Sequence, residues 1–421
     1  MVAFAFMVAL VSFVPSPFAA AIPPGISTCV AQSLHELDSG DGPVQGEENN
    51  NPATSRLRRF RYSEPHLGTH VSFTVYAPQS GIANRAAEAA FVEVRRLDAV
   101  FSSYRSDSEL AKLHQTHWTN QEAERTYRIS RDFAFVLSRA LELSRNSNGA
   151  FDATVGPYAR VWKRAIRRNT LPERSSLEKV ASHVGHQLVV VADAPATVDA
   201  SDALLPGEQP SAELPTSQVN LLHPKVRLDF SAIAKGYIAD RALATFRKHG
   251  LRQVLVDAGG DLAIGDPPPD KPGWTVSVET GRKQSSVDET PANLAVCVRN
   301  CGIATSGDAF QRIASNGQRY SHIIDPRTGD SVTHGLSVTV LAADALTADA
   351  LASACSVAGR EGGASQQILA KYPNSLGLFV SPESGSRQNE VRAFCEGVSR
   401  YNRQIADSLR ATSGLDGSAE K

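Results

Sequence analysis

Residues 226–259 read VRLDFSAIAKGYIADRALATFRKHGLRQVLVDAG, and this stretch decides the class of the fold. VRLDF (226–230) predicts a strand, the following residues predict a helix from about Ala232 to Gly250, and QVLVDAG (253–259) predicts a second strand. Strands and helices interleave with short turns on both sides of this unit. The sequence therefore predicts an α+β fold in which helices pack on a mixed sheet around one large core.

The N-terminal half supplies further elements of this fold. THVSFTVYA (69–77) alternates apolar and polar residues and predicts a strand. A helix is predicted at 83–104, where apolar residues recur at helical spacing: Phe91, Val94, Leu97 and Phe101. Ser106 and Glu109 have the spacing of a capping box. Another helix, 129–149, is expected to end at its Asn-rich, glycine-containing terminus.

The C-terminal half continues the same alternation. Strands are predicted for TVSVET, NLAVCV, RYSHII and LSVTVLA, which are residues 275–280, 293–298, 319–324 and 336–342. A helix that contains LTADALASA (346–354) is expected to end at Gly359.

Composition narrows the class of function. The chain of 421 residues has a formal net charge of -1 and a pI near 6.8, so it carries no basic excess for binding nucleic acid. With 42% hydrophobic and 21% charged residues, it has the composition of an ordinary globular protein.

The N-terminus predicts export. MVAFAFMVALVSFV is apolar up to Pro15 and is followed by small residues, which is typical of a signal peptide spanning 1–21, although no Lys or Arg precedes Arg56. Residues 22–57 are polar and rich in Gly, Pro and Asn, and predict a disordered linker. The expected location is the periplasm, and association of the mature protein with a membrane stays open.

The remaining chain divides into one catalytic unit and a tail. Residues 58–400 form the predicted catalytic domain, interrupted by a polar, proline-bearing surface insertion at 192–219. Residues 401–421 form a polar C-terminal tail. Cys297 and Cys301 are close in sequence, and either a local disulfide or a pair of buried thiols is compatible with their spacing.

Asp349 and Ser353 in LTADALASA are four residues apart, so on a helix their oxygens lie on one face, one turn apart. A structural explanation is an acid in the first helical turn with Thr347 as the cap and Ser353 as a packing residue. A functional explanation is an oxygen-rich site for a hard cation.

Five further stretches combine glycine with residue types found in active sites: GAFDATVGP (149–157), LDFSAIAKGYIAD (228–240), DAGGDL (257–262), ATSGD (304–308) and HIIDPRTGD (322–330). Each one alone is also typical of a turn. Together and in this order, from about Leu67 to Gly359, they resemble the FAD:protein FMN transferases of the ApbE family. The resemblance implies one catalytic unit that cleaves FAD at its pyrophosphate.

The resemblance implies a magnesium site. Asp349 and Ser353 match the family's metal-binding Asp and Thr, with Ser in place of Thr, and Ala232 matches a third ligand through its backbone carbonyl. Mg²⁺ prefers oxygen ligands and neutralises charge that develops at a pyrophosphate.

The resemblance also implies a flavin-nucleotide site. The residues matching its contacts are Leu67, Tyr104, Ala150, Phe151, Asp152, Asp229, Lys235 and Ile324. His322 matches a residue that acts as a base or orients the substrate. Thr305, Ser306 and Asp308 are expected near the phosphates without an assigned role.

For several of these residues a purely structural role is also compatible with the sequence. Tyr104 is compatible with a packing role, Asp152 with a loop cap, and Lys235 with a solvated lysine on a helix face. His322 is compatible with a histidine that only bonds Asp325 in the turn.

The implied reaction transfers FMN from FAD to a Thr or Ser hydroxyl of an acceptor protein and releases AMP. The family's acceptors carry Asp-Gly-x-Thr/Ser-Gly-Ala-Thr/Ser, which this chain lacks. The expected acceptor is therefore another protein, such as a subunit of a membrane redox complex. The alternatives are an FAD pyrophosphatase, which uses water as acceptor, and a non-catalytic flavin-binding protein.

Overall fold

The computed structural model describes residues 29–30, 57–120, 125–168, 170–192, 216–278, 294–307, 312–315, 318–381 and 390–394. The predicted signal peptide, the polar tail and Asp308 lie outside these residues, as does most of the predicted linker and insertion. Within the described ranges, none of the helices combines the length and the apolar character that crossing a lipid bilayer requires.

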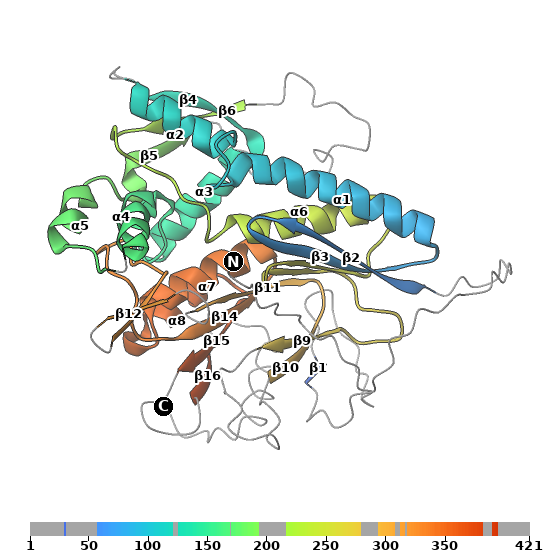
Figure 1. The fold of residues 1–421 in the computed structure, drawn as a ribbon. Helices are drawn as coiled ribbons and strands as arrows, with labels where there is room; N and C mark the ends of the chain where they lie inside the picture. Colours follow the sequence, from blue (N-terminus) through green and yellow to red (C-terminus); the bar gives the residue numbers. More distant parts are fainter. Residues whose placement is uncertain are drawn as a thin grey trace, which may run out of the picture.

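An eight-stranded sheet forms the centre of the molecule (Figure 1). In spatial order its strands are β16 (Glu390–Phe394), β15 (Leu376–Ser381), β14 (Ser337–Ala342), β11 (Cys301–Ser306), β8 (Leu262–Ile264), β7 (Val254–Ala258), β3 (Thr69–Ala77) and β2 (Arg58–His66). Each pairing in this sheet is antiparallel. The α+β class is confirmed, and the sheet is antiparallel where a mixed one was expected. Tight turns allow this, because they join β2 to β3 and β7 to β8 as hairpins.

Three smaller sheets surround the central one, and all their pairings are antiparallel. Their strands, in spatial order within each sheet, are β1 (Cys29–Val30), β10 (Leu294–Val298) and β9 (Trp274–Val278); β12 (Arg312–Ser315) and β13 (Gln318–Ser321); and β4 (Thr126–Ser130), β6 (Thr216–Leu221) and β5 (Val189–Ala192). Strand β6 begins at Thr216, so the last residues of the expected surface insertion, 192–219, belong to a strand.

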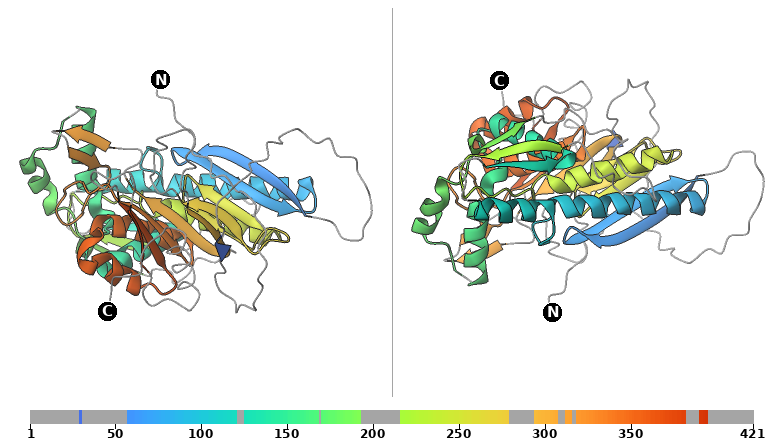
Figure 2. Two further views of the ribbon diagram at one scale, coloured as in Figure 1. Left: turned by 90° about the horizontal axis from the view of Figure 1, so that it is seen from below. Right: turned by 90° about the horizontal axis from the view of Figure 1, so that it is seen from above.

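The α-helices are α1 (Ser80–Phe101), α2 (Glu109–Thr119), α3 (Arg131–Asn146), α4 (Gly156–Arg167), α5 (Arg174–Ala181), α6 (Ala234–Lys248), α7 (Ala345–Ala358) and α8 (Ala364–Ala370). Short 3-10 turns are η1 (Ala153–Val155), η2 (His186–Leu188) and η4 (Glu361–Gly363). The long helices α1 and α6 run side by side along the central sheet (Figures 1 and 2).

The middle strands of the central sheet are covered on both faces. On one face, Phe73 of β3 packs against Phe91 of α1 and Phe246 of α6, with ring centroids 4.3 and 5.0 Å apart. On the other face, Leu255 and Ile264 join a separate apolar cluster with Trp274 and the sheet formed by β1, β10 and β9. Helices, central sheet and small sheet thus form three layers, and alternate residues of a strand enter different cores.

The apolar periodicity that predicted β3 and α1 is confirmed by the burial of their residues. Val71, Phe73 and Val75 of β3 are all buried, and so are the four apolar residues that predicted α1. The ends of β7 and α6 also lie within a few residues of the expected positions.

Two expectations about local structure were wrong. VRLDF forms no strand, since the N–H of Leu228 donates to His114 Nε2 at 3.0 Å and that of Asp229 to the carbonyl of Ala153 at 2.7 Å. The N-cap of α2 is Ser108 rather than Ser106, and its hydroxyl oxygen accepts from the N–H of Ala111 at 3.0 Å.

The cysteines resolve one open alternative. Cys297 and Cys301 lie on β10 and β11 as buried thiols rather than half-cystines. Their closeness in sequence does not pair them, because the turn at Asn300 sends the two strands into different sheets.

Candidate active site

The first functional cluster lies where the N-terminal ends of α6 and α7 meet. Gly236 allows this contact, because a Cβ at this position would lie 2.1 Å from the carbonyl oxygen of Ala345. At this point the N–H of Gly236 donates to Oδ2 of Asp349 at 3.2 Å. The close approach of two backbones therefore positions the carboxylate that the sequence assigned to a metal.

The start of α7 is held by two other acids. Asp344 is the N-cap and accepts from the N–H of Thr347 at 2.7 Å, so the alternative that made Thr347 the cap is wrong. Asp240 of α6 accepts from the N–H groups of Ala345 and Leu346, each at 2.9 Å. Because the helix begins at Ala345, Asp349 lies in its second turn, and the alternative explanation of an acid in the first helical turn is wrong.

Asp240 was missed by sequence reasoning. Burial, reinforced by the neighbouring charge of Asp344, raises the pKa of Asp240 to about 8. The sequence shows that Asp240 lies one turn beyond Gly236 on the predicted helix. It does not show that Asp240 accepts hydrogen bonds from N–H groups more than a hundred residues away in the chain.

Lys235 forms a direct ion pair with Asp261, which is 2% exposed. Burial opposes the charged ammonium, but the carboxylates of Asp261 and Asp349 outweigh it and raise the pKa of Lys235. The alternative of a solvated surface lysine is therefore wrong. Burial and the charge of Asp261 in turn raise the pKa of Asp349, against the attraction of Lys235.

A tight turn brings Asp261 to this cluster. Gly259 and Gly260 have φ of 73° and 99°, in the left-handed region that favours glycine. The N–H of Gly260 donates to Oδ1 of Asp257 at 2.8 Å, which closes the turn between β7 and β8. A Cβ at Gly259 would lie 2.5 Å from Thr69, so the turn packs against the β2–β3 hairpin next to Leu67.

The donor set of the expected metal site fits a hard cation. Asp349 is 5% exposed and receives one long hydrogen bond, so its carboxylate retains capacity for a further ligand. Ser353 lies one turn later on α7 and is half-buried, and Ala232 lies in the turn before α6. Among the described residues, no group of three or more His, Cys, Asp or Glu side chains is arranged around a metal position. The expected site needs only one such side chain, with the remaining ligands coming from a hydroxyl, a carbonyl and the substrate.

A second group of predicted residues surrounds the turn GAFD. Asp152 is occupied by the protein itself, with Oδ1 accepting from the N–H and hydroxyl of Thr154 and Oδ2 from the N–H of His186 at 2.7 Å. Ala150 and Phe151 are 2% and 4% exposed and belong to the main core. The carboxylate of Asp152 therefore caps the loop, which is the structural role that the sequence left open for it.

The turn 325–329 lies against this loop. A Cβ at Gly149 would be 3.3 Å from the side chain of Arg327, and the indole N–H of Trp162 donates to the carbonyl of Gly329 at 2.8 Å. Asp325 accepts three hydrogen bonds from Arg327, at 2.7 to 2.9 Å. His322 is exposed at the start of the turn, and Ile324 forms a bridge with Ser331.

Asp229 connects the two groups. Its N–H donates to Ala153 beside GAFD, its Oδ1 accepts from the N–H of Ser231 at 3.0 Å, and the chain then enters α6. The structure thus places 149–153, 229–235 and 322–329 in one neighbourhood.

Leu67 and Tyr104 occupy exposed or strained positions. Leu67 has φ of 58°, followed by Gly68 at 72°, so the two form the tight turn between β2 and β3. A leucine in this region is strained, and such strain is concentrated at functional sites. Tyr104 is 82% exposed, with the Lys163 ammonium 5.9 Å from its ring centroid, so its packing alternative is wrong.

The fold and the cluster of two buried acids with a paired lysine define an α+β protein whose site offers carboxylate oxygens and one ammonium group. Residues 67–375 match the ApbE family. The FAD:protein FMN transferase of Treponema pallidum is 30% identical over 348 residues, covering 79% of this chain and 87% of that protein. The enzyme of the same name from Haemophilus influenzae is 30% identical over 308 residues, covering 72% and 80%. The chain belongs to the ApbE family.

Solved structures show the same fold. The flavin transferase ApbE from Vibrio cholerae superposes with a TM-score of 0.64 at 24% identity, covering 81% of this chain and 99% of that one. The apo flavinyl transferase ApbE of Pseudomonas stutzeri superposes with a TM-score of 0.65 at 22% identity, covering 83% and 97%.

Proposed function

We propose that this protein transfers the FMN half of FAD to a Thr or Ser hydroxyl of an acceptor protein, in a Mg²⁺-dependent reaction that releases AMP. Family membership makes the chain an enzyme, and the shared name of its relatives makes it a transferase that uses FAD and a protein acceptor. The hydroxyl, the metal ion and the particular residues are the finer parts of the proposal.

The observation that carries the proposal is the pair of buried acids, Asp349 and Asp261, with the half-buried Lys235 beside them where α6 meets α7. A pyrophosphate brings negative charge, which an oxygen-ligated cation and a lysine can compensate in a site of low dielectric constant. Asp349, Ser353 and the carbonyl of Ala232 would hold Mg²⁺. When bound, the ion neutralises charge that develops on the pyrophosphate.

The remaining residues bind the substrate and move the proton. Tyr104 offers an open aromatic face for stacking, and Leu67 an apolar contact from a strained turn. In the reaction the acceptor oxygen forms a bond to the FMN phosphorus, the bond to the AMP phosphate breaks, and the hydroxyl proton passes to His322. An imidazole suits this role because its pKa lies near neutrality.

The acceptor and the location belong to the same proposal. The acceptor carries Asp-Gly-x-Thr/Ser-Gly-Ala-Thr/Ser and is a subunit of a membrane redox complex, reached after export to the periplasm. Support for export comes from the apolar run before Pro15. Mass spectrometry of the protein from its host should find a mature N-terminus near Ala20 to Ile22, and an intact Met1 would contradict export.

The activity is tested with FAD, Mg²⁺ and a peptide that carries the acceptor motif. The peptide should gain the mass of FMN less one water, AMP should appear in equal amount, and a peptide with Val in place of the acceptor Thr should gain nothing. AMP release without peptide labelling would identify an FAD pyrophosphatase instead. FAD binding without AMP release would identify a flavin-binding protein.

A further inference from the structure

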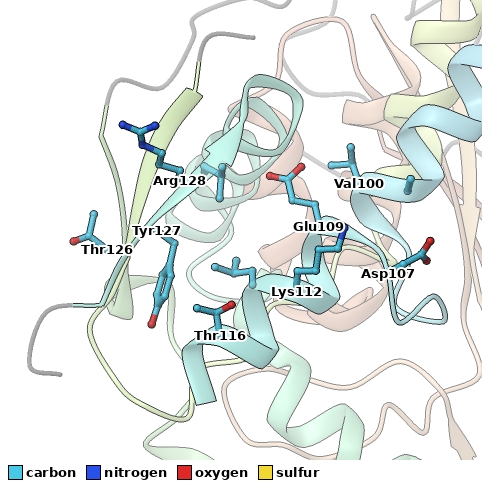
Figure 3. Close-up of a pocket in the computed structure, with 11 residues that line it drawn as sticks. Val100, Asp107, Glu109, Lys112, Thr116, Thr126, Tyr127 and Arg128 are labelled. Carbon is cyan, nitrogen blue, oxygen red and sulfur yellow. The ribbon is translucent and has the colours of Figure 1, made fainter. Parts of the chain in front are cut away.

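A cavity of about 590 Å³ lies between the C-terminal end of α1, helix α2 and strand β4 (Figure 3). None of the predicted site residues lines it. Its floor includes the apolar side chains of Val100, Leu113 and Ile129, and polar side chains surround them. The volume is in the range of cavities that bind ligands.

One wall of the cavity is a strand that lies at the edge of its sheet among the residues that the structure describes. Strand β4 is the outer strand of the order β4–β6–β5. The N–H of Leu221 donates to the carbonyl of Arg125 at 3.1 Å, so the backbone groups of 125, 127 and 129 face β6. In an antiparallel pair, the backbone groups of Thr126, Arg128 and Ser130 then face the other way.

The other wall is α2, which faces this edge. The N–H of Ser130 donates to Oε1 of Glu109 at 2.6 Å, directly across the gap between β4 and α2. Thr126 and Arg128 have the same orientation as Ser130, and both line the cavity. Their N–H and C=O groups can therefore pair with an added strand.

The charges of the cavity favour an acidic occupant. Asp107 is neutralised by Arg105, whose Nε and NH2 groups donate to it at 3.0 and 2.7 Å, and Glu109 is already bonded to Ser130. By contrast, neither Lys112 nor Arg128 forms a direct ion pair within the part of the chain that the structure describes, and the Lys112 ammonium acts on Asp107 only as one of several groups that lower the pKa of that carboxyl. Both cations can therefore receive a carboxylate of an occupant.

The cavity also adjoins a residue of the proposed FAD site. Asp107 lines the cavity and is three residues from Tyr104 in the turn between α1 and α2. At most about 3.6 Å of chain per residue separates them, so their Cα atoms are within about 11 Å of each other. A polypeptide in the cavity would lie beside a flavin bound at Tyr104.

We propose that this cavity binds an extended, acidic segment of the acceptor polypeptide, which adds as a strand to the outer edge of β4. Main-chain hydrogen bonds to Thr126 and Arg128 supply the pairing, and Lys112 and Arg128 bind flanking carboxylates. The inference rests on the proposed function, because that function requires a polypeptide acceptor.

The test uses a dye-labelled peptide, Glu-Glu-Asp-Gly-Ser-Thr-Gly-Ala-Thr, whose binding is measured by fluorescence anisotropy without FAD. Lys112→Glu and Thr126→Pro should each raise its Kd at least about tenfold, the first by charge and the second by removing an N–H that faces the cavity. FAD affinity and thermal stability should stay as in the wild type.

Two control variants make the same chemical changes away from the cavity. Lys179→Glu makes the same charge change on exposed α5, and Val191→Pro removes an outward N–H from β5, the opposite edge of the same sheet. Both should leave the Kd of the peptide unchanged. N-methylation of alternate peptide amides should abolish binding in one register and spare it in the other, since only alternate amides of a strand face its neighbour.

The outcomes separate this inference from the proposed function. If the wild type labels the peptide with FMN while both cavity variants bind it normally, the cavity assignment is overturned and the function stands. If the wild type binds the peptide with the expected variant defects but transfers no FMN, the proposed function fails and the cavity assignment stands.

Discussion

Gly236 is the position where one methyl group should disrupt both the fold and the site. An alanine there would place its Cβ 2.1 Å from the oxygen and 2.5 Å from the carbon of the Ala345 carbonyl, and 2.8 Å from the N of Leu346. These are backbone atoms, so no side-chain rotation relieves the overlap. Helices α6 and α7 must move apart.

Two effects of this substitution lower the free energy of unfolding and one raises it. Overpacking of this kind costs about 1–3 kcal/mol. Separation of the helices also weakens the hydrogen bonds from Gly236 to Asp349 and from Ala345 and Leu346 to Asp240, each contributing about 0.5–1.5 kcal/mol. The helix propensity of alanine returns only about 1 kcal/mol. Gly236→Ala should therefore lower the free energy of unfolding by roughly 1.5–6.5 kcal/mol when all three hydrogen bonds are lost.

Urea and thermal melts measure this change, and Gly81→Ala provides the control. Gly81 lies exposed in the first turn of α1, where an added Cβ meets only the flexible end of Arg85 at 3.6 Å. Propensity should act alone there, so this variant should be as stable as the wild type or more stable. If Gly236→Ala is also as stable as the wild type, the close contact between α6 and α7 is wrong.

Three further predictions concern the site. Asp349→Ala should reduce AMP release from FAD at least about a hundredfold across a Mg²⁺ titration. Loss of the metal ion removes several kcal/mol of transition-state stabilisation, and each 1.4 kcal/mol is about tenfold in rate. Ser353→Ala should cost less and Ser353→Thr almost nothing, and full activity of Asp349→Ala at low Mg²⁺ would refute the metal assignment. Burial raises the pKa of Asp240 to about 8, above its unfolded value, so its contribution to stability is present at low pH and is lost as pH rises through 8. Melts from pH 5 to 9 should show a decline that is smaller in Asp240→Asn, and equal slopes would contradict this. Leu67→Asn creates the Asn-Gly pair preferred in this hairpin turn, so stability should hold or rise while FAD binds more weakly in a titration. A marked loss of stability would show that Leu67 is not strained.

The sequence by itself determined the elements whose pattern is local. The apolar spacing of α1 and the alternation of β3 appear in the structure with the expected residues buried. The ordered set of glycine- and acid-containing turns also identified the family, because backbone turns need particular residues at fixed positions. These features depend on neighbours within a few residues, which a sequence displays directly.

Only the tertiary structure decided which groups are partners. Lys235 pairs with Asp261, Asp240 caps a helix more than a hundred residues away, and Asp152 accepts from the N–H of His186. VRLDF has the composition of a strand, yet its N–H groups bond to His114 and Ala153 instead of a neighbouring strand. A hydrogen bond or an ion pair depends on distance in space, and folding brings these atoms together from parts of the chain whose local sequence carries no record of the other.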